Sequence, residues 1–240
     1  MYSKLITGIQ QALASGILMA YRQGACRNIA IIGGGGCSLP SHLLHKLGKN
    51  ISIDVIEPSA RVLRVAKQHF GFTDVSEGLD VTEFLMTGEQ YLSDLCSNEE
   101  SGVLDVVCCD AMQTIHLEID ADDDGTGYSE AKETVSLDLS PPPTLLGKIP
   151  QMFDLLSSGG YLFLNVVGPA YYIQEAYARV VAASSGFEST LLYKVKQGLA
   201  TNYLVVARKG SGIDMEKENK ELQGIFNEYA VESIERVELE

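Results

Sequence analysis

The chain has 240 residues, of which 45% are hydrophobic and 21% charged, as in a globular protein with one large core and unlike a disordered chain. Its 32 acidic and 18 basic residues give a formal net charge of −14, which argues against nucleic acid as a partner and favours a basic protein surface. The five cysteines lack CxxC or zinc-finger spacing, so they indicate reduced thiols in the cytoplasm rather than a disulfide or zinc framework.

The segment 5–20 is apolar enough to raise the question of a signal peptide or a membrane span. Gln10 and Gln11 interrupt it, and it is too short to cross a bilayer. Its apolar residues recur at steps of three and four, which is the stripe of a helix packed on a core. The stripe consists of Leu5, Ile9, Leu13, Ile17 and Ala20. We therefore expect a structural helix and no membrane association.

A glycine run separates the first predicted strand from the next helix. Ile29–Ile32 is followed by Gly33–Gly36 and by a helical pattern over 39–47, with Ser38 and Pro40 in positions typical of a helix start. Glycines at such a junction let the backbone approach a ligand closely, and the N–H groups that open the helix face the same spot. We expect a small, partly anionic ligand here, although such turns also close ordinary strand-helix junctions.

The next predicted strand, 51–56, ends at Glu57 and Pro58. Glu57 lies about 20 residues beyond the glycine loop, the spacing at which nucleotide-binding α/β folds have an acid that accepts from ribose hydroxyls. The alternative is a solvated carboxylate that caps the following helix, predicted over 60–70.

Two further strands are predicted to end near acidic residues. A short one near 73–76 leads into Glu77 and Gly78, and an amphipathic helix follows. An apolar run over 103–109, typical of a parallel strand buried on both faces, ends at Asp110. Because ligands bind at the carboxyl ends of strands in open α/β sheets, we expect all four strand ends to meet in one crevice. For Asp110 the alternative is a turn-forming role.

Residues 111–140 carry no convincing helix or strand and are rich in Asp and Glu. Because this insertion follows Asp110, it should overhang the crevice, and we interpret it as an acidic lid or collar that steers a basic partner. A solvated insertion without a role is an equally good interpretation.

The second half of the chain continues the alternation. We predict a helix over 143–156, a strand over 161–167, a helix over 171–184, and an antiparallel pair over 189–196 and 202–207. The fold class is therefore α/β, with a doubly wound, mostly parallel seven-stranded sheet and an antiparallel C-terminal edge.

The domain organisation follows from a shift in composition near Gly210. Residues 1–210 form the domain that carries the crevice, and 211–240 form a charged amphipathic helix with apolar residues through Ile234 and Val237. This helix docks either on its own domain or on a second copy in a homodimer.

Several strings at the predicted strand ends resemble one known family. The strings are IIGGGGCSLP, IDVIEPSARVLRVAKQHFGF, SEGLD, LDVVCCDA, PPP and LFLNVV. With them the chain resembles, over about 2–208, the class I S-adenosylmethionine-dependent methyltransferases of the spermidine-synthase-like branch, and within it the C-terminal domain of the methyltransferase-like thirteen proteins. The resemblance implies a Rossmann-like methyltransferase fold with S-adenosyl-L-methionine as cofactor.

The resemblance also implies roles for individual residues. The glycines of the loop would contact the methionine part of the cofactor, Glu57 its ribose hydroxyls and Glu77 its adenine amino group. Asp110 would lie between the cofactor and the acceptor amine as the catalytic residue, and no metal is implied. The expected site residues are Gly33, Gly34, Gly35, Glu57, Pro58, Glu77, Gly78, Asp110 and Ala111.

The chain departs from the family's pattern in three places. Cys37 stands where the third glycine of the loop is usual, so the cofactor should approach more tightly. Ala111, Met112 and Gln113 follow Asp110, where aminopropyltransferases carry a second acid that grips the polyamine. The β-hairpin that covers the polyamine site in those enzymes is also missing before the first strand. The second and third departures argue against polyamine synthesis.

The acceptor is constrained by proton chemistry. Methyl transfer from a sulfonium requires a neutral nucleophile held near the methyl group. An α-amine with a pKa of about 7.7 to 8.0 is partly neutral at physiological pH, whereas a lysine amine near about 10.4 must first lose a proton. An ionised Asp110 would oppose that loss.

We therefore expect an amine N-methyltransferase that acts on an N-terminal α-amine or a lysine of a basic protein. The resemblance implies translation elongation factor one-alpha as the kind of substrate. The alternatives are a polyamine aminopropyltransferase and a non-catalytic binding module, which keeps the cofactor pocket or the shape of the fold and acts by association through the acidic insertion and the C-terminal helix.

Two other motifs give weaker evidence of a functional site. His42 and His45 form H-x-x-H but have no third ligand at metal spacing, so we expect no metal site. Tyr171, Tyr172 and Tyr177 are better explained by helix packing than by an aromatic cage.

Overall fold

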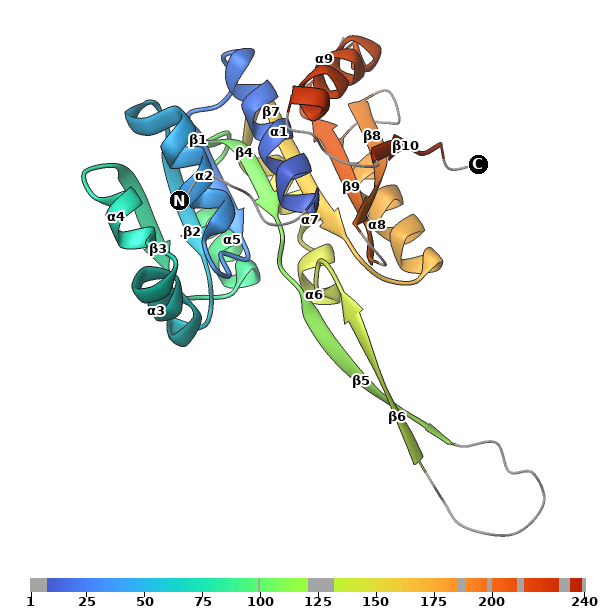
Figure 1. The fold of residues 1–240 in the computed structure, drawn as a ribbon. Coiled ribbons are helices and arrows are strands. Elements are labelled where there is room, and N and C mark those ends of the chain that lie inside the picture. The colour runs from blue at the N-terminus through green and yellow to red at the C-terminus, as the bar shows by residue number, and fades with distance from the viewer. Residues whose placement is uncertain are drawn as a thin grey trace, which may run out of the picture.

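The computed structural model describes residues 8–98, 100–120, 132–184, 189–197, 200–210, 214–228 and 234–238. Its centre is an eight-stranded sheet in the order β10-β8-β9-β7-β4-β1-β2-β3 (Figure 1). The strands of this sheet are β1 (Asn28–Ile32), β2 (Ser52–Ile56), β3 (Asp80–Phe84), β4 (Leu104–Cys109), β7 (Leu156–Val166), β8 (Thr190–Gln197), β9 (Ala200–Arg208) and β10 (Ile234–Arg236).

Strand direction divides this sheet into two parts. From β7 through β4, β1 and β2 to β3, neighbouring strands are parallel. β9 is antiparallel to both β7 and β8, and β10 is antiparallel to β8. The predicted doubly wound, mostly parallel sheet with an antiparallel C-terminal edge is confirmed. The predicted number of seven strands is wrong, because β10 pairs with β8 as an eighth.

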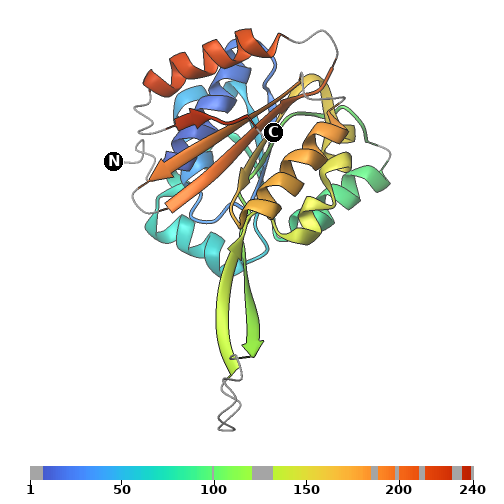
Figure 2. The ribbon, with the colours of Figure 1, turned by 90° about the vertical axis from the view of Figure 1, so that its right-hand side faces the viewer.

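Helices cover both faces of the sheet (Figure 2). One face packs against α1 (Gly8–Arg22), α2 (Ser38–Leu47), α3 (Ala60–His69), α4 (Phe72–Ser76) and α9 (Met215–Glu228). The other face packs against α5 (Gly88–Ser97), α6 (Pro143–Leu146), α7 (Ile149–Leu155) and α8 (Ala170–Ala183). A short 3-10 helix, η1 (Gly48–Asn50), follows α2.

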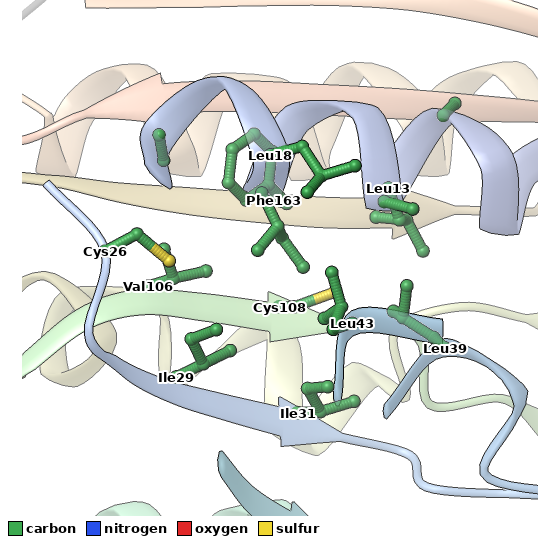
Figure 3. Packing of buried hydrophobic residues seen from close by; sticks show 14 of the residues in the cluster. Leu13, Leu18, Cys26, Ile29, Ile31, Leu39, Leu43, Val106, Cys108 and Phe163 are labelled. Carbon is green, nitrogen blue, oxygen red and sulfur yellow. The ribbon is translucent and has the colours of Figure 1, made fainter. Parts of the chain in front are cut away.

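The helix expected over 5–20 is α1, which lies on the centre of the sheet (Figure 3). Leu13 and Leu18 of this helix pack in the same cluster as Phe163 of β7. The approach is close, because a Cβ on Gly16 would lie 2.3 Å from Phe163 Cε1. Residue Leu5 of the expected stripe lies outside the described residues. Within the described chain, no helix is both long and apolar enough to span a membrane.

The third strand does not lie where the sequence suggested. Residues 73–76 belong to helix α4, which buries Phe72 in the core, and the strand is β3 at Asp80–Phe84. β3 is an edge strand whose side chains are exposed or only partly buried, and its Glu83 pairs with Lys67 of α3 at 2.7 Å. A half-exposed strand that carries acids gives a weak apolar signal, which explains the error.

Residues 111–140 are not an irregular loop over the crevice. β5 (Gln113–Asp120) and β6 (Lys132–Leu139) form an antiparallel ribbon that pairs from Gln113 opposite Leu139 to Asp120 opposite Lys132. Its base meets the domain, and the ribbon extends away from it (Figures 1 and 2). The middle of the insertion, 121–131, lies outside the described residues.

Two boundaries of the second half also differ from expectation. The helix predicted over 143–156 is divided into α6 and α7, and the strand predicted over 161–167 begins earlier, since β7 starts at Leu156. The C-terminal helix, expected to run through Ile234, ends at Glu228. Ile234 instead begins strand β10.

The C-terminal helix docks on its own domain. α9 packs against α1 and β8, and its Glu218 is 5% exposed. The Glu218 carboxylate accepts hydrogen bonds from Tyr161 OH (2.6 Å) and Gln23 Nε2 (3.0 Å) and pairs with Arg208 at 2.6 Å. A buried carboxylate with three donors fixes the helix at one place on the sheet.

Candidate functional site

The carboxyl ends of β1, β2, β3 and β4 surround a cleft of about 470 Å³. Each strand end contributes a short segment, and α6 closes one wall. The lining includes Gly33 and Gly35 after β1, Glu57 and Pro58 after β2, Thr87, Gly88 and Glu89 after β3, Asp110, Ala111, Met112 and Gln113 after β4, and Pro142, Thr144 and Leu145 at α6.

The glycine loop is held tightly between two strand ends. Gly33 has a φ of +96°, and a Cβ there would lie 2.6 Å from the Ala111 nitrogen. The N–H groups of Gly33 and Gly34 both donate to the carbonyl of Ile56, at 3.0 and 3.1 Å. Gly35, with a φ of +49°, faces open space instead. Gly33 and Gly35 both line the cleft, but Gly33 packs against the backbone after β4, Gly34 lies against β2, and Gly35 leaves open space.

Cys37 ends the loop in the left-handed conformation that glycine usually adopts, with a φ of 55°. Its side chain is fully buried, and burial raises the pKa of its thiol to about 12. It packs with the residues of α2 and β2 and is not part of the cleft lining. The side chain therefore does not narrow the approach to the loop, contrary to expectation.

Glu57 ties the loop to the second strand end. It is 9% exposed, and its Oε2 accepts from the Gly35 N–H at 3.0 Å while Oε1 accepts from the Ser59 N–H at 2.9 Å. Helix α3 is capped by the Ser59 hydroxyl, which accepts from the Val62 N–H, and Glu57 in turn holds the N–H of Ser59, so it supports the helix start while being buried and not solvated. Each carboxylate oxygen keeps a second acceptor direction for hydroxyls in the cleft.

Glu77 and Gly78 do not reach the cleft. Glu77 follows α4, and both residues precede β3, so they lie toward the amino end of that strand instead of its carboxyl end. The expectation that Glu77 ends a strand is wrong, since the strand follows it.

The third strand end is formed by Thr87, Gly88 and Glu89. Thr87 caps α5 through a capping box with Gln90, in which each residue's side chain accepts from the other's backbone N–H. A Cβ on Gly88 would lie 2.4 Å from Ile32 Cγ2, so this turn can approach β1 only with glycine. The T-G-E-Q string is a capping-box signature that could have located this strand end from sequence.

Asp110 extends the pairing of β4 with β1 by one residue, because its N–H donates to the carbonyl of Ile32 at 2.8 Å. Its Oδ1 accepts from Asn165 Nδ2 at 2.8 Å. Asp110 is therefore held by the sheet and is not a turn former. Burial raises its pKa to about 6, although the Asn165 hydrogen bond lowers it, so the carboxyl is ionised at neutral pH.

The other sequence motifs lie away from the cleft. His42 is buried and His45 is exposed, and the described residues contain no group of three or more side chains placed to hold a metal ion. Tyr172 packs in the core, whereas Tyr171 is 64% exposed, so the two side chains do not share a site. The cysteines are free thiols, and Cys108 and Cys109 of β4 are buried as expected.

No protein-family model and no curated protein matches the sequence. Solved structures match along nearly the whole chain. Human methyltransferase-like protein 13, in complex with SAH, has a TM-score of 0.66 at 19% identity, over 94% of this chain and 93% of that one. A probable spermidine synthase from Corynebacterium glutamicum has a TM-score of 0.62 at 11% identity, over 95% and 80%.

A protein from Listeria monocytogenes described as a class I S-adenosylmethionine-dependent methyltransferase has a TM-score of 0.56 at 14% identity, over 94% of this chain and 73% of that one. These similarities show that the chain has the fold shared by class I methyltransferases and spermidine synthases. The fold implied by the sequence resemblance is confirmed.

Proposed function

We propose that this protein is an S-adenosylmethionine-dependent methyltransferase that methylates an amine nitrogen of a basic protein. The observation that carries the proposal is the convergence of a bare glycine loop, a buried carboxylate and a desolvated aspartate on one cleft of a methyltransferase fold. In such sheets, ligands bind at the carboxyl ends of the strands.

The residues of the cleft fit this cofactor. The volume of about 470 Å³ lies within the range of small-molecule sites, roughly 300–1,000 Å³. Gly33 and Gly35 would hold the methionine part, since both line the cleft and a Cβ at Gly35 would have nothing within 4 Å. Glu57 would accept from the two ribose hydroxyls, and the turn at Thr87 and Gly88 would border the adenine. This assignment replaces the one that gave the adenine to Glu77.

When bound, the cofactor supplies a methyl group activated by a sulfonium. Asp110 would accept a hydrogen bond from the acceptor amine and orient its lone pair. Its carboxylate also stabilises the ammonium form, so an α-amine, which loses its proton more readily than lysine, is the easier acceptor. Asp110→Ala should therefore abolish turnover and leave cofactor affinity intact; a variant that still turns over would refute the catalytic role.

The protein substrate is inferred from the ribbon formed by β5 and β6. Met112 and Gln113 line the cleft, and the ribbon continues directly from Gln113. Its two strands carry four acids and one lysine: Glu118, Asp120, Glu133, Asp138 and Lys132. A basic protein bound along the ribbon would bring an amine to the cleft, with an affinity that falls as salt is added.

Removal of residues 118–135 tests this role of the ribbon. The shortened protein should bind cofactor as before but require more protein substrate for half-maximal rate, and its rate should depend less on salt. Unchanged kinetics would contradict the proposed role.

A polyamine aminopropyltransferase is the second candidate, because a probable spermidine synthase shares the fold. The residues after Asp110 disfavour it, since Ala111, Met112 and Gln113 supply no second acid to hold a polyamine. Binding of decarboxylated S-adenosylmethionine in preference to the intact molecule would favour this candidate.

The acceptor is tested with radiolabelled S-adenosylmethionine and three substrates. These are translation elongation factor one-alpha, a peptide of its N-terminus with a free α-amine, and the same peptide acetylated at that amine. Label on the free peptide alone supports α-amine methylation, and label on both peptides supports lysine. Absence of label from all three, with cofactor bound, contradicts this substrate class.

A further inference from the structure

Three polar side chains form a row across the neighbouring strands β4, β7 and β9. Cys109 of β4 pairs with Leu164 of β7, so Asp110 follows in register with Asn165. Asn165 Nδ2 donates to Asp110 Oδ1 at 2.8 Å, and Asn202 Nδ2 of β9 donates to Asn165 Oδ1 at 3.0 Å. Two amides in series therefore connect β9 to the aspartate of the cleft.

The orientation of the central amide is determined by this row. Asn165 is 1% exposed, so its amide must find its partners within the protein. A flipped amide would turn its oxygen toward the Asp110 carboxylate, and two acceptors would then face each other. Because Asn202 donates to Oδ1, the Nδ2 donor of Asn165 is directed at Asp110.

The backbone around the row is held as well. The hydroxyl of Ser140, which is fully buried, can donate to the carbonyl of Ala111 at 2.7 Å or of Asn165 at 2.9 Å. This hydroxyl bridges the segment after β4 and the end of β7. The separation between Asp110 and Asn165 is thereby fixed by main chain as well as by side chains.

In this arrangement one carboxylate oxygen of Asp110 accepts a hydrogen bond from the protein, and the other is available to a ligand. Oδ1 accepts from Asn165, whereas Oδ2 has no hydrogen-bond donor in the described part of the chain. We propose that Asn165, oriented by Asn202, is a positioning residue that holds Asp110 so that Oδ2 accepts from the acceptor amine in the cleft. This inference rests on the proposed amine methylation.

The same hydrogen bond keeps the carboxylate ionised. Burial raises the pKa of Asp110, and the donor from Asn165 acts against that rise. The titratable groups near it on β4 are the thiols of Cys108 and Cys109, whose pKa values are themselves raised by burial, and Glu57 and Glu89 line the same cleft. Without the Asn165 donor, Asp110 would be protonated to a larger extent at neutral pH.

Two variants and one matched control test the proposal. Asn165→Leu removes both hydrogen bonds of the central amide, and Asn202→Ala removes only the bond that orients it. Asn219→Ala on α9 is the control. The Asn219 side chain also takes part in a hydrogen bond, which it accepts from Tyr193 OH, but it does not line the cleft.

Two measurements are made on each variant. A carbon-13 NMR titration of the Asp110 carboxyl, assigned with Asp110→Asn, should show its pKa raised by about 1 in Asn165→Leu and by less in Asn202→Ala. The kcat with the amine substrate should fall about 10- to 100-fold in Asn165→Leu. The dissociation constant of S-adenosylmethionine should not change, and the control should match the wild type in all three.

The outcomes separate this proposal from the proposed function. An unchanged pKa of Asp110 together with an unchanged kcat in folded Asn165→Leu overturns the positioning role. If Asn165→Leu does not fold, Asn202→Ala decides by the same two readouts. If the wild type methylates no amine, the proposed function fails, and the NMR titration alone then decides whether Asn165 controls the Asp110 carboxyl.

Discussion

Replacing Asp110 with asparagine should stabilise the fold at neutral pH and not in acid. The ordinary pKa of this carboxyl is 3.8, and burial raises it to about 6 in the folded protein. Below both values the carboxyl is protonated in either state. As the pH rises from about 4 to about 6, the carboxyl ionises in the unfolded chain before it ionises in the folded one, so the free energy of unfolding falls. Above about 6 the carboxyl is ionised in both states, and the free energy of unfolding falls no further on its account.

The magnitude follows from the difference between the two pKa values. At about 1.4 kcal/mol for each pKa unit, the ionised carboxyl costs the fold about 3 kcal/mol at neutral pH. Asp110 keeps contact with water in the cleft, so we expect about 1–3 kcal/mol. Asparagine removes this cost and can still accept from Asn165 Nδ2 through its own oxygen.

Urea unfolding of the wild type and Asp110→Asn at pH 4 and pH 8 measures the effect. The free energy of unfolding of the variant, relative to that of the wild type, should be about 1–3 kcal/mol higher at pH 8 than at pH 4. The same substitution at Asp154, an exposed residue of α7, is the matched control for the loss of one negative charge. A variant whose stability differs from the wild type by the same amount at both pH values would refute the reasoning.

Three further predictions concern the fold. Among the five cysteines only Cys96 is not buried, so iodoacetamide should label one thiol per native chain and none in Cys96→Ser; rapid labelling of a second thiol would contradict the burial. Glu218→Ala removes the buried acceptor shared by Tyr161 OH, Gln23 Nε2 and the half-exposed Arg208, and should lower the free energy of urea unfolding by about 1–3 kcal/mol, whereas Glu228→Ala at an exposed ion pair should change little; equal effects would refute the distinction. Gly33→Ala should abolish cofactor binding or destabilise the loop, and unchanged calorimetry and melting would argue against its close packing.

The parts of the site that could be predicted from sequence are those where one local signal was strong. β1 and β4 are nearly continuous apolar runs that end at Gly33 and Asp110, and Glu57 follows β2 at the spacing of a nucleotide-binding acid. Buried parallel strands have this composition because both faces are covered. The sequence therefore located three of the four strand ends correctly.

The third strand end was misplaced because its signals compete. Thr73 and Val75 are β-branched and favour a strand, but the segment is helix α4, in which Phe72 is fully buried. The true strand carries Asp80 and Glu83 on an exposed edge. Tertiary packing decided between the two, and a local pattern does not contain that information.

The ribbon and the row of amides depend on pairing between distant segments. Ile115 and Leu137 are paired across the ribbon, and apolar and polar residues alternate along both strands, so the two-residue period of a strand is present in the sequence and only the pairing had to come from the structure. Asn165 and Asn202 are separated by 37 residues and meet Asp110 only through strand order. A single sequence does not fix that order, so the positioning of Asp110 emerged only from the structure.

Calorimetric titration of the purified protein with S-adenosylmethionine, its demethylated product and the decarboxylated analogue tests the central claim most directly. Glu57→Gln tests the cleft, and Glu77→Gln is its matched control, because Glu77 lies before β3. We predict that the wild type binds the first two ligands with micromolar affinity and does not bind the third. Glu57→Gln should lose this binding, and Glu77→Gln should retain it. Preference for the decarboxylated analogue, or no binding by any of the three, would contradict the account.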